Sequence, residues 1–254
     1  MQNERLIHDK PNVSLVIGAG SIKCAAAIGV YDVLQQVGVQ VNQVVGCSGG
    51  SIYASLIALG LEPAQIEQEV RRLWTRELTE VKRLKGYLMA ALPRYRRFKE
   101  QFSVRDDKLI LERLRAAFGT HTIERTLIPL FINATDLNTG QEVVFREGDI
   151  VEAIRASIAI PAVFQPHQIG AGLYSDGMLS NPLPIDIAAK SGADIIIAVG
   201  FHSNLSQNIN SLSRFNRHIN KILTNSLLRA HIELCERAYG AHVLVLEPQL
   251  NERV

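Results

Sequence analysis

The chain has 254 residues, of which 47% are hydrophobic and 20% are charged, and its formal net charge is +2. This apolar content and low net charge exclude an intrinsically disordered chain, and 18 glycines with 9 prolines exclude collagen-like or low-complexity sequence. The three cysteines, Cys24, Cys47 and Cys235, form no C-x-x-C pair, so neither a disulfide framework nor a zinc ribbon is expected.

The first part of the chain alternates strand and helix patterns. Residues 13–18 (VSLVIG) form a β-branched apolar run that ends at glycine, which is typical of a buried parallel strand. Residues 22–36 favour a helix, and residues 41–45 form a second strand that closes on Gly46. Residues 51–60 are apolar on nearly all sides, which indicates a buried helix. This order predicts a parallel sheet covered by helices on both faces.

The same alternation returns after a gap. Asp149 is placed to cap a helix, and the two prolines of the stretch 160–166 predict an extended conformation there. The sequence therefore predicts one α/β domain over residues 1–254, a three-layer α/β/α fold with a mainly parallel central sheet. The expected strands cover 130–135, 142–146, 173–175, 194–200 and 242–247, and the expected helices cover 149–157, 184–191 and 209–239.

A basic segment interrupts the alternation at residues 71–105. It holds eleven Lys and Arg against three acids, with aromatic and aliphatic residues between them, and predicts a helical insertion within the domain. Three interpretations of its charge are considered. A solvated helical face is the simplest, and an anionic membrane surface suits a cationic, aromatic-studded segment. Nucleic acid is disfavoured because the rest of the chain carries no recognition motif.

The chemistry-bearing motif is Gly46-Cys47-Ser48-Gly49-Gly50, which matches G-x-S-x-G. This pattern is typical of a nucleophile elbow, in which a serine lies at a strained turn between a strand and a helix. The expected strand before it and the buried helix after it give Ser48 that context, and the helix dipole would favour negative charge there. A plain or phosphate-binding glycine turn is the alternative interpretation.

A serine nucleophile needs a base. Seven histidines are present, and Asp176 followed by His202, His231 or His242 would fit the chain order of an α/β-hydrolase triad. However, Ser48 follows only the second expected strand, which is early for that fold. No histidine lies in a distinctive glycine or turn context, so surface or core-edge positions are the preferred interpretation for all seven.

Five blocks of sequence, in register, resemble the patatin-like phospholipase family. Between about residues 13 and 200 they follow the family's order, whereas the basic segment and the last 50 residues match only loosely. The blocks are residues 15–24 (LVIGAGSIKC) with 28–30 (IGV), residues 46–51 (GCSGGS), residues 134–140 (ATDLNTG), residues 156–161 (ASIAIP), and residues 175–177 (SDG) with 181–184 (NPLP).

The resemblance implies a Ser48–Asp176 dyad, with Ser48 as the nucleophile and Asp176 as the base. It also implies an oxyanion hole from the backbone N–H groups of Ala19, Gly20 and Ser21. This loop departs from the family's usual glycine run, so a positive φ there would strain Ala19 or Ser21. The residues implied to support the loop and the elbow are Gly18, Lys23, Gly46, Gly50 and Gly177. Lys23 would brace the loop or neutralise a phosphate.

The resemblance thus implies a serine lipid acyl hydrolase of the phospholipase, lysophospholipase or carboxylesterase type. Its substrate would be an acyl lipid, and no cofactor or metal is expected. Two alternatives stay open, namely an acyltransferase that passes the acyl group to an acceptor and a catalytically silent membrane-associated adaptor. Because no signal peptide or spanning segment is visible, a cytoplasmic location is expected, with peripheral membrane contact through residues 71–105.

Overall fold

The structure is a computed structural model that describes residues 10–74, 107–161, 163–205, 209–239 and 241–249. Residues 75–105 of the predicted basic insertion (71–105) lie outside the described residues. Among the residues that are described, no helix is both long enough and apolar enough to cross a membrane.

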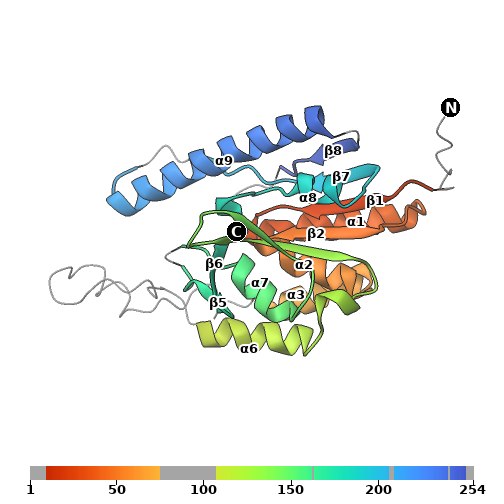
Figure 1. Cartoon of the computed structure of the whole chain (residues 1–254), viewed down its shortest axis with the longest axis horizontal. Coiled ribbons are helices and arrows are strands. Elements are labelled where there is room, and N and C mark those ends of the chain that lie inside the picture. The colour runs from red at the N-terminus through yellow and green to blue at the C-terminus, as the bar shows by residue number, and fades with distance from the viewer. Residues whose placement is uncertain (1–9, 75–106, 162, 206–208, 240, 250–254) are drawn as a thin grey trace.

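A single eight-stranded sheet organises the molecule (Figure 1). The strands run in the order β5-β6-β3-β2-β1-β7-β8, and β4 pairs with β3 away from this path. The neighbours from β3 to β8 are parallel, whereas β4, β5 and β6 are antiparallel to their partners, so the prediction of a mainly parallel sheet is confirmed. The strands are β1 (Val13–Ile17), β2 (Gln43–Cys47), β3 (Leu130–Asp136), β4 (Glu142–Phe145), β5 (His167–Ile169), β6 (Gly172–Asp176), β7 (Ile195–Val199) and β8 (His242–Leu246).

Helices cover both faces of this sheet, as an apolar strand such as β1 requires. Alternate residues of β1 belong to two apolar clusters. Leu15 and Ile17 pack on one face of the sheet, and Val16 packs on the other. The predicted three-layer α/β/α architecture is therefore confirmed. The first face carries α1 (Ala26–Gln36), α2 (Gly49–Ala58), α3 (Pro63–Leu73), α6 (Asp107–Phe118) and α7 (Ile150–Ser157), and the second carries α8 (Ile185–Lys190) and α9 (Leu212–Ala238).

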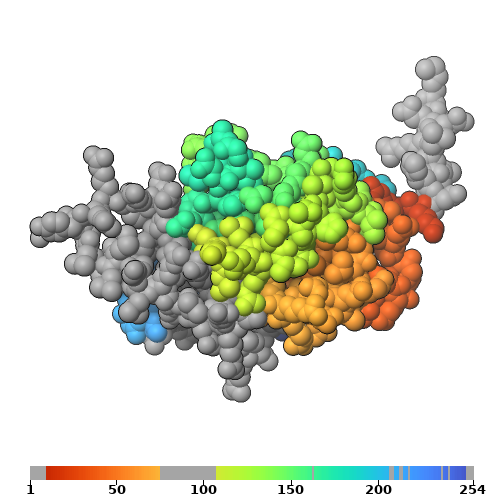
Figure 2. Space-filling model, turned by 90° about the horizontal axis from the view of Figure 1, so that it is seen from below, coloured from red at the N-terminus to blue at the C-terminus, as the bar shows by residue number. Residues whose placement is uncertain are grey.

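Three 3-10 turns complete the described elements: η1 (Ser21–Ala25), η2 (Ile123–Arg125) and η3 (Gly177–Leu179). Figure 2 views the molecule from below, where α3 (orange) and α6 (yellow-green) form much of the coloured surface. Helix α3 packs against α1 and α2, and α6 packs against α3 and α7, whereas α2 and α7 contact the strands directly.

Several local predictions need correction. The helix expected from residue 22 begins as the 3-10 turn η1 and becomes α-helical only at Ala26. The stretch 160–166 is not extended, because the N–H groups of Val163 and Phe164 donate to the carbonyl oxygen of Ile160. Pro161 fixes the φ that the second position of such a turn requires, so the proline favours this turn over the extended conformation that the sequence predicts.

Candidate active site

Ser48 lies at a sharp turn between strand β2 and helix α2. Strand β2 ends at Cys47 and α2 begins at Gly49, and Ser48 between them has φ 51° and ψ −127°. A positive φ is costly for a residue with a Cβ, and such strain concentrates at functional sites. The side chain is only 3% exposed. This is the backbone geometry of a nucleophile elbow.

The glycines on either side of Ser48 allow this turn to pack. A Cβ on Gly46 would lie 2.5 Å from the Cα of Ser51, and a Cβ on Gly50 would overlap the carbonyl oxygen of Ile17. Helix α2 therefore rests directly on the backbone of β1. Two other predicted support residues are equally tight, because a Cβ on Gly18 would meet Leu183 and Pro182 and a Cβ on Gly177 would meet Asn133.

Asp176 comes from β6, which flanks β3 on the side away from β2, and its side chain contacts Ser48 at the end of β2. It is the last residue of β6, which pairs antiparallel with β3 so that Asp176 lies opposite Ala134. The Oγ of Ser48 donates a hydrogen bond of 2.6 Å to Oδ2 of Asp176. The other carboxylate oxygen, Oδ1, accepts the N–H of Met178 at 2.9 Å. Two residues that are 128 positions apart are thus brought into contact.

Burial changes the acidity of Asp176. The side chain is fully buried, and this desolvation raises its pKa to about 7, although the hydrogen bonds from Ser48 and from the N–H of Met178 oppose the shift. A carboxyl group with an ordinary pKa near 3.9 is a weak base at neutral pH. The raised pKa gives Asp176 the proton affinity that a general base needs at physiological pH.

Ser157 also contacts the elbow, and the sequence analysis assigned it no role. Its Oγ accepts the backbone N–H of Ser48 at 2.8 Å, and its side chain is fully buried at the end of α7. The stretch 156–161 was noted only as a family-like block. Nothing in the sequence signals this contact, because the two serines are 109 residues apart.

The glycine-rich loop after β1 packs against the elbow. A Cβ on Gly49 would lie 2.7 Å from the Cα of Ser21. Ser21 has φ 52°, which makes it the second of two non-glycine residues with positive φ in the described part of the chain. Of the two residues at which strain was expected, Ser21 therefore carries it, while the N–H of Ala19 donates to the carbonyl oxygen of Pro182 at 2.8 Å.

Because of that hydrogen bond, the amides free to bind an oxyanion differ from the three that the family resemblance implies (Ala19, Gly20 and Ser21). The N–H of Ala19 is already engaged, whereas those of Gly20 and Ser21 make no hydrogen bond to the described residues. Gly49, the first residue of α2, likewise has no acceptor within its helix. Lys23 lines a cavity of about 200 Å³ together with Phe201 and His202, and neither Ser48 nor Asp176 is among the residues that line it.

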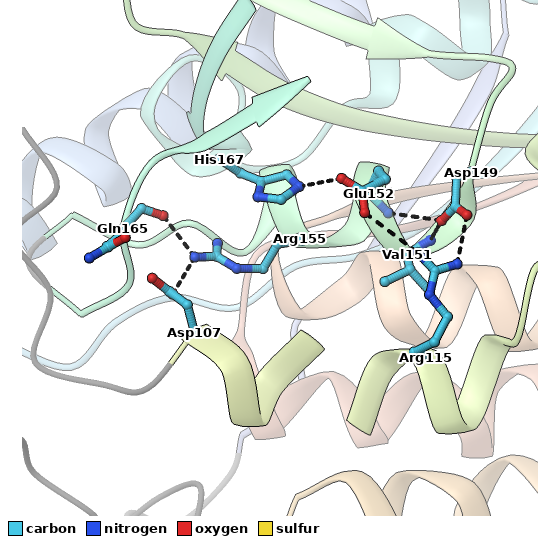
Figure 3. A network of polar contacts seen from close by, with 8 residues as sticks. All are labelled: Asp107, Arg115, Asp149, Val151, Glu152, Arg155, Gln165 and His167. Atoms are coloured by element: carbon cyan, nitrogen blue, oxygen red, sulfur yellow. Dashed lines mark hydrogen bonds and ion pairs between the residues drawn. The ribbon is translucent and has the colours of Figure 1, made fainter. Parts of the chain in front are cut away.

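A polar network fixes helix α7, which carries Ser157, against α6 and β5 (Figure 3). Asp149 accepts the N–H groups of Val151 and Glu152, which confirms it as the predicted N-cap. Arg115 of α6 pairs with Asp149 at 2.6 Å, and Nε2 of His167 lies 2.7 Å from Glu152. The beginning of α7 is therefore held from two sides.

The end of α7 is held by a buried arginine. Arg155, 1% exposed, pairs with Asp107 at the first turn of α6 and donates to the carbonyl oxygen of Gln165 at 2.9 Å (Figure 3). Its guanidinium also lies 5.4 Å from the centre of the Phe164 ring. Ser157 is only two residues further along α7. The contacts of Arg155 therefore help to hold the Ser157 hydroxyl in position against the backbone N–H of Ser48.

The alternative of a histidine base, as in a Ser–His–Asp triad, is not supported at this site. Within the described residues, no histidine contacts Ser48 or Asp176, and Nδ1 of His202 instead pairs with Glu247 at 2.8 Å. Cys47 is buried beside the nucleophile, and this burial raises the pKa of its thiol, so it remains a protonated packing residue. No set of three His, Cys, Asp or Glu in the described ranges is arranged to hold a metal ion.

Comparison with known proteins assigns the chain to a family. A family model described as patatin-like phospholipase matches residues 15–189, a range that includes both Ser48 and Asp176. The chain belongs to the patatin-like phospholipase family. An NTE family protein of Mycobacterium tuberculosis is 33% identical over 196 residues, which cover 76% of this chain and 50% of that protein.

A second relative and one solved structure add to this comparison. Patatin-like phospholipase domain-containing protein 6 of Mus musculus is 29% identical over 74% of this chain and 13% of its own length. The crystal structure of VipD from Legionella pneumophila superposes with a TM-score of 0.53 at 14% identity, covering 96% of this chain and 63% of that one, which supports the fold. The chain spans about half the length of the mycobacterial relative. The family match ends within α8, before α9 and β8.

Proposed function

We propose that the protein is a serine lipid acyl hydrolase that cleaves carboxylic ester bonds with a Ser48–Asp176 dyad. One observation carries this proposal: the 2.6 Å hydrogen bond from the Oγ of Ser48, at a strained turn, to a buried carboxylate whose pKa is raised to about 7. A turn with only a structural role needs neither the positive φ nor the buried acid. Membership of the patatin-like phospholipase family supports an acyl lipid as the substrate.

The reaction follows two half-steps. Asp176 accepts the hydroxyl proton as the Oγ of Ser48 attacks the ester carbonyl, and the same carboxyl group then protonates the departing alcohol, which leaves an acyl-serine. Water, deprotonated by Asp176, attacks that acyl-serine, and the proton returns to Ser48 as the fatty acid leaves. Each half-step forms and breaks one C–O bond. In the first, Asp176 passes the proton of Ser48 to the departing alcohol, and in the second it passes a proton of water to the Oγ of Ser48.

Negative charge on the tetrahedral intermediate needs donors that are already in place. The N–H groups of Gly20 and Ser21 face no other acceptor among the described residues, and that of Gly49 begins α2 beside the nucleophile. We therefore assign the oxyanion hole to Gly20, Ser21 and Gly49, and Ala19 supports the loop through its bond to Pro182. The positive end of the α2 dipole adds to this stabilisation.

A fluorophosphonate probe tests the nucleophile. We expect the wild type to be labelled on one serine, and Ser48→Ala to abolish labelling together with hydrolysis of a short-chain soluble ester. Ser55→Ala is the matched control, because Ser55 is an equally buried serine of α2 and bonds only the carbonyl oxygen of Ser51. Labelling that survives in Ser48→Ala would contradict the proposal. Product analysis with an added alcohol acceptor separates hydrolysis from acyl transfer.

Ser157 is a positioning residue in this scheme, and a pair of variants isolates its hydroxyl. Threonine and valine have nearly the same shape, but only threonine keeps an oxygen to accept the N–H of Ser48. We expect kcat to be roughly tenfold lower for Ser157→Val than for Ser157→Thr, with KM unchanged, because the unpaired buried N–H loosens the elbow. Equal kcat values for the two variants would remove Ser157 from the mechanism.

A further inference from the structure

Helix α9 is much longer than the strands it connects. It has 27 residues and is therefore about 40 Å long, whereas β7 and β8 have five residues each and span roughly 16 Å. Because β7 and β8 are parallel, α9 begins at the carboxyl edge of the sheet, the edge at which β2 ends beside Ser48. Figure 1 shows the light-blue beginning of α9 extending well past β7 and β8.

Burial along α9 agrees with this overhang. The buried side chains of the helix are Asn225, Leu228 and Cys235, all in its second half, where it packs with α8. None of the described side chains from 214 to 224 is buried. The first half of α9 thus projects from the fold with no described element covering it.

This projecting half has an apolar stripe. Phe215, Ile219, Ile222 and Leu223 are 48%, 37%, 37% and 61% exposed, and their spacing of four, seven and eight residues places them on one side of the helix. The preceding loop adds Leu205, which is 50% exposed. Large apolar side chains that gather on one exposed helix face mark an interaction site.

The charged residues of the segment that contains the stripe are all basic. Residues 201–232 contain no aspartate or glutamate, although the whole chain has 25. They contain Arg214, Arg217, Lys221 and Arg229. At 3.6 residues per turn, Arg214 and Lys221 lie on the polar side of the helix, away from the apolar stripe, and the Nζ of Lys221 donates to the carbonyl oxygen of Asn204 at 2.8 Å. A helix with an apolar face, a basic polar face and no acids is the pattern that lies in the interface of an anionic bilayer.

We propose that the first half of α9 is a membrane-docking helix whose partner is an anionic phospholipid surface. Phe215 and Leu223 enter the boundary between head groups and acyl chains, and the basic side chains contact the lipid phosphates. Charge complementarity selects this occupant over a second copy of the chain, since two such helices would bring like charges together. The carboxyl edge of the sheet, with Ser48, then faces the lipid. None of the residues named for this site belongs to the segment 75–106.

Vesicle binding tests the apolar stripe. We use the full chain carrying Ser48→Ala, so that no lipid is consumed, with phosphatidylcholine vesicles that contain or lack phosphatidylglycerol. Adding Phe215→Ser and Leu223→Ser should lower the partition coefficient for the anionic vesicles at least tenfold. The matched control is Val37→Ser with Leu127→Ser, two residues that are 65% and 79% exposed at the opposite edge of the sheet, and it should bind like the parent.

Charge reversal and a fluorescent reporter give independent readouts. Arg214→Glu should weaken binding by at least about fivefold, and only at low salt, whereas Lys10→Glu at the amino edge should have little effect. The three native cysteines are buried, so a single added Cys takes an environment-sensitive dye. A dye on Phe215→Cys should brighten with anionic vesicles, and a dye on Val37→Cys should not.

The outcomes that overturn the proposal are specific. Vesicle binding that ignores phosphatidylglycerol, or that is unchanged by Phe215→Ser with Leu223→Ser, removes α9 as the docking helix. Self-association of the parent that this pair abolishes, seen by analytical ultracentrifugation, assigns the face to a second copy instead. With Ser48 intact, the pair should keep full turnover of a soluble ester and lose turnover of vesicle lipid. If no Ser48-dependent ester turnover exists, the proposed function fails while the vesicle data still decide the docking.

Discussion

Replacing Asp176 with asparagine should lower kcat for ester hydrolysis by roughly 10³–10⁴-fold while making the folded protein more stable at pH 8. Asparagine has the same shape, and its amide can keep both local contacts, since the oxygen accepts the N–H of Met178 and the nitrogen donates to the Oγ of Ser48. What it cannot do is accept a proton. Loss of activity without loss of fold is therefore the expected result.

The stability gain follows from the raised pKa of Asp176. In the unfolded chain the carboxyl group ionises near its ordinary pKa of 3.8, whereas in the folded protein it holds its proton up to about pH 7. The wild type therefore loses stability as the pH rises from about 4 to 7, because the folded state must ionise a buried group. Asparagine stays neutral, so its advantage grows over that window and reaches the order of a few kcal/mol above pH 7.

Two measurements check this prediction. Urea denaturation of both proteins at about pH 4, 6 and 8 follows the stability difference. In the wild type, kcat/KM should increase as the pH rises, with an apparent pKa near 7. Asp136→Asn is the control, because Asp136 ends β3 in a turn and should affect neither. Retained activity in Asp176→Asn, or a kcat/KM that falls with rising pH, would contradict the role of Asp176 as the base.

Replacing Gly50 with alanine should destabilise the fold by at least about 3 kcal/mol. The new Cβ would overlap the carbonyl oxygen of Ile17 and lie 2.7 Å from that of Gly18, and neither backbone atom can move without shifting β1 in the centre of the sheet. Helix α2 would have to lift from β1, which also displaces Ser48. We expect a lower midpoint in chemical denaturation and a loss of probe labelling together.

Gly29→Ala provides the matched control for this substitution. Gly29 lies within α1, its φ is not positive, and a Cβ there would meet no atom within 4 Å. Alanine should therefore stabilise the protein by up to about 1 kcal/mol, because it favours the helix more than glycine does. If Gly50→Ala were as stable as Gly29→Ala, the close packing of α2 on β1 would be refuted.

The alternation of elements could be predicted from the sequence because the central strands are short apolar runs, and β1 and β7 are each followed directly by glycine. Strand β1 and the α8–β7 pair, for example, lie within one or two residues of their predicted positions. The short edge strand β5 (His167–Ile169) was missed, since three partly exposed residues carry no apolar period and pair only because β6 offers an edge. The turn at Ile160 was missed because a proline fits both a turn and an extended chain.

Part of the candidate site could likewise be predicted from the sequence, and part of it could not. Ser48 could be found from a local motif, and Asp176 from a resemblance, because both belong to short recognisable blocks. Their roles remain predictions, although the 2.6 Å contact supports them. The position of Ser157 and the engagement of the Ala19 amide by Pro182 could not be predicted, because each depends on a contact between residues more than 100 positions apart. No local pattern encodes such a pair.

The antiparallel pairing of β6 with β3 has a consequence for the newly made protein. Because side chains alternate along a strand, a slip of one residue from the Ala134–Asp176 register would turn the carboxylate to the opposite face of the sheet. A nascent chain that has been synthesised only as far as β3 carries the serine but not yet the acid. Under the proposed mechanism, the serine therefore becomes reactive only after β6 has been synthesised and has paired with β3. An incomplete chain on the ribosome would not hydrolyse the surrounding lipids.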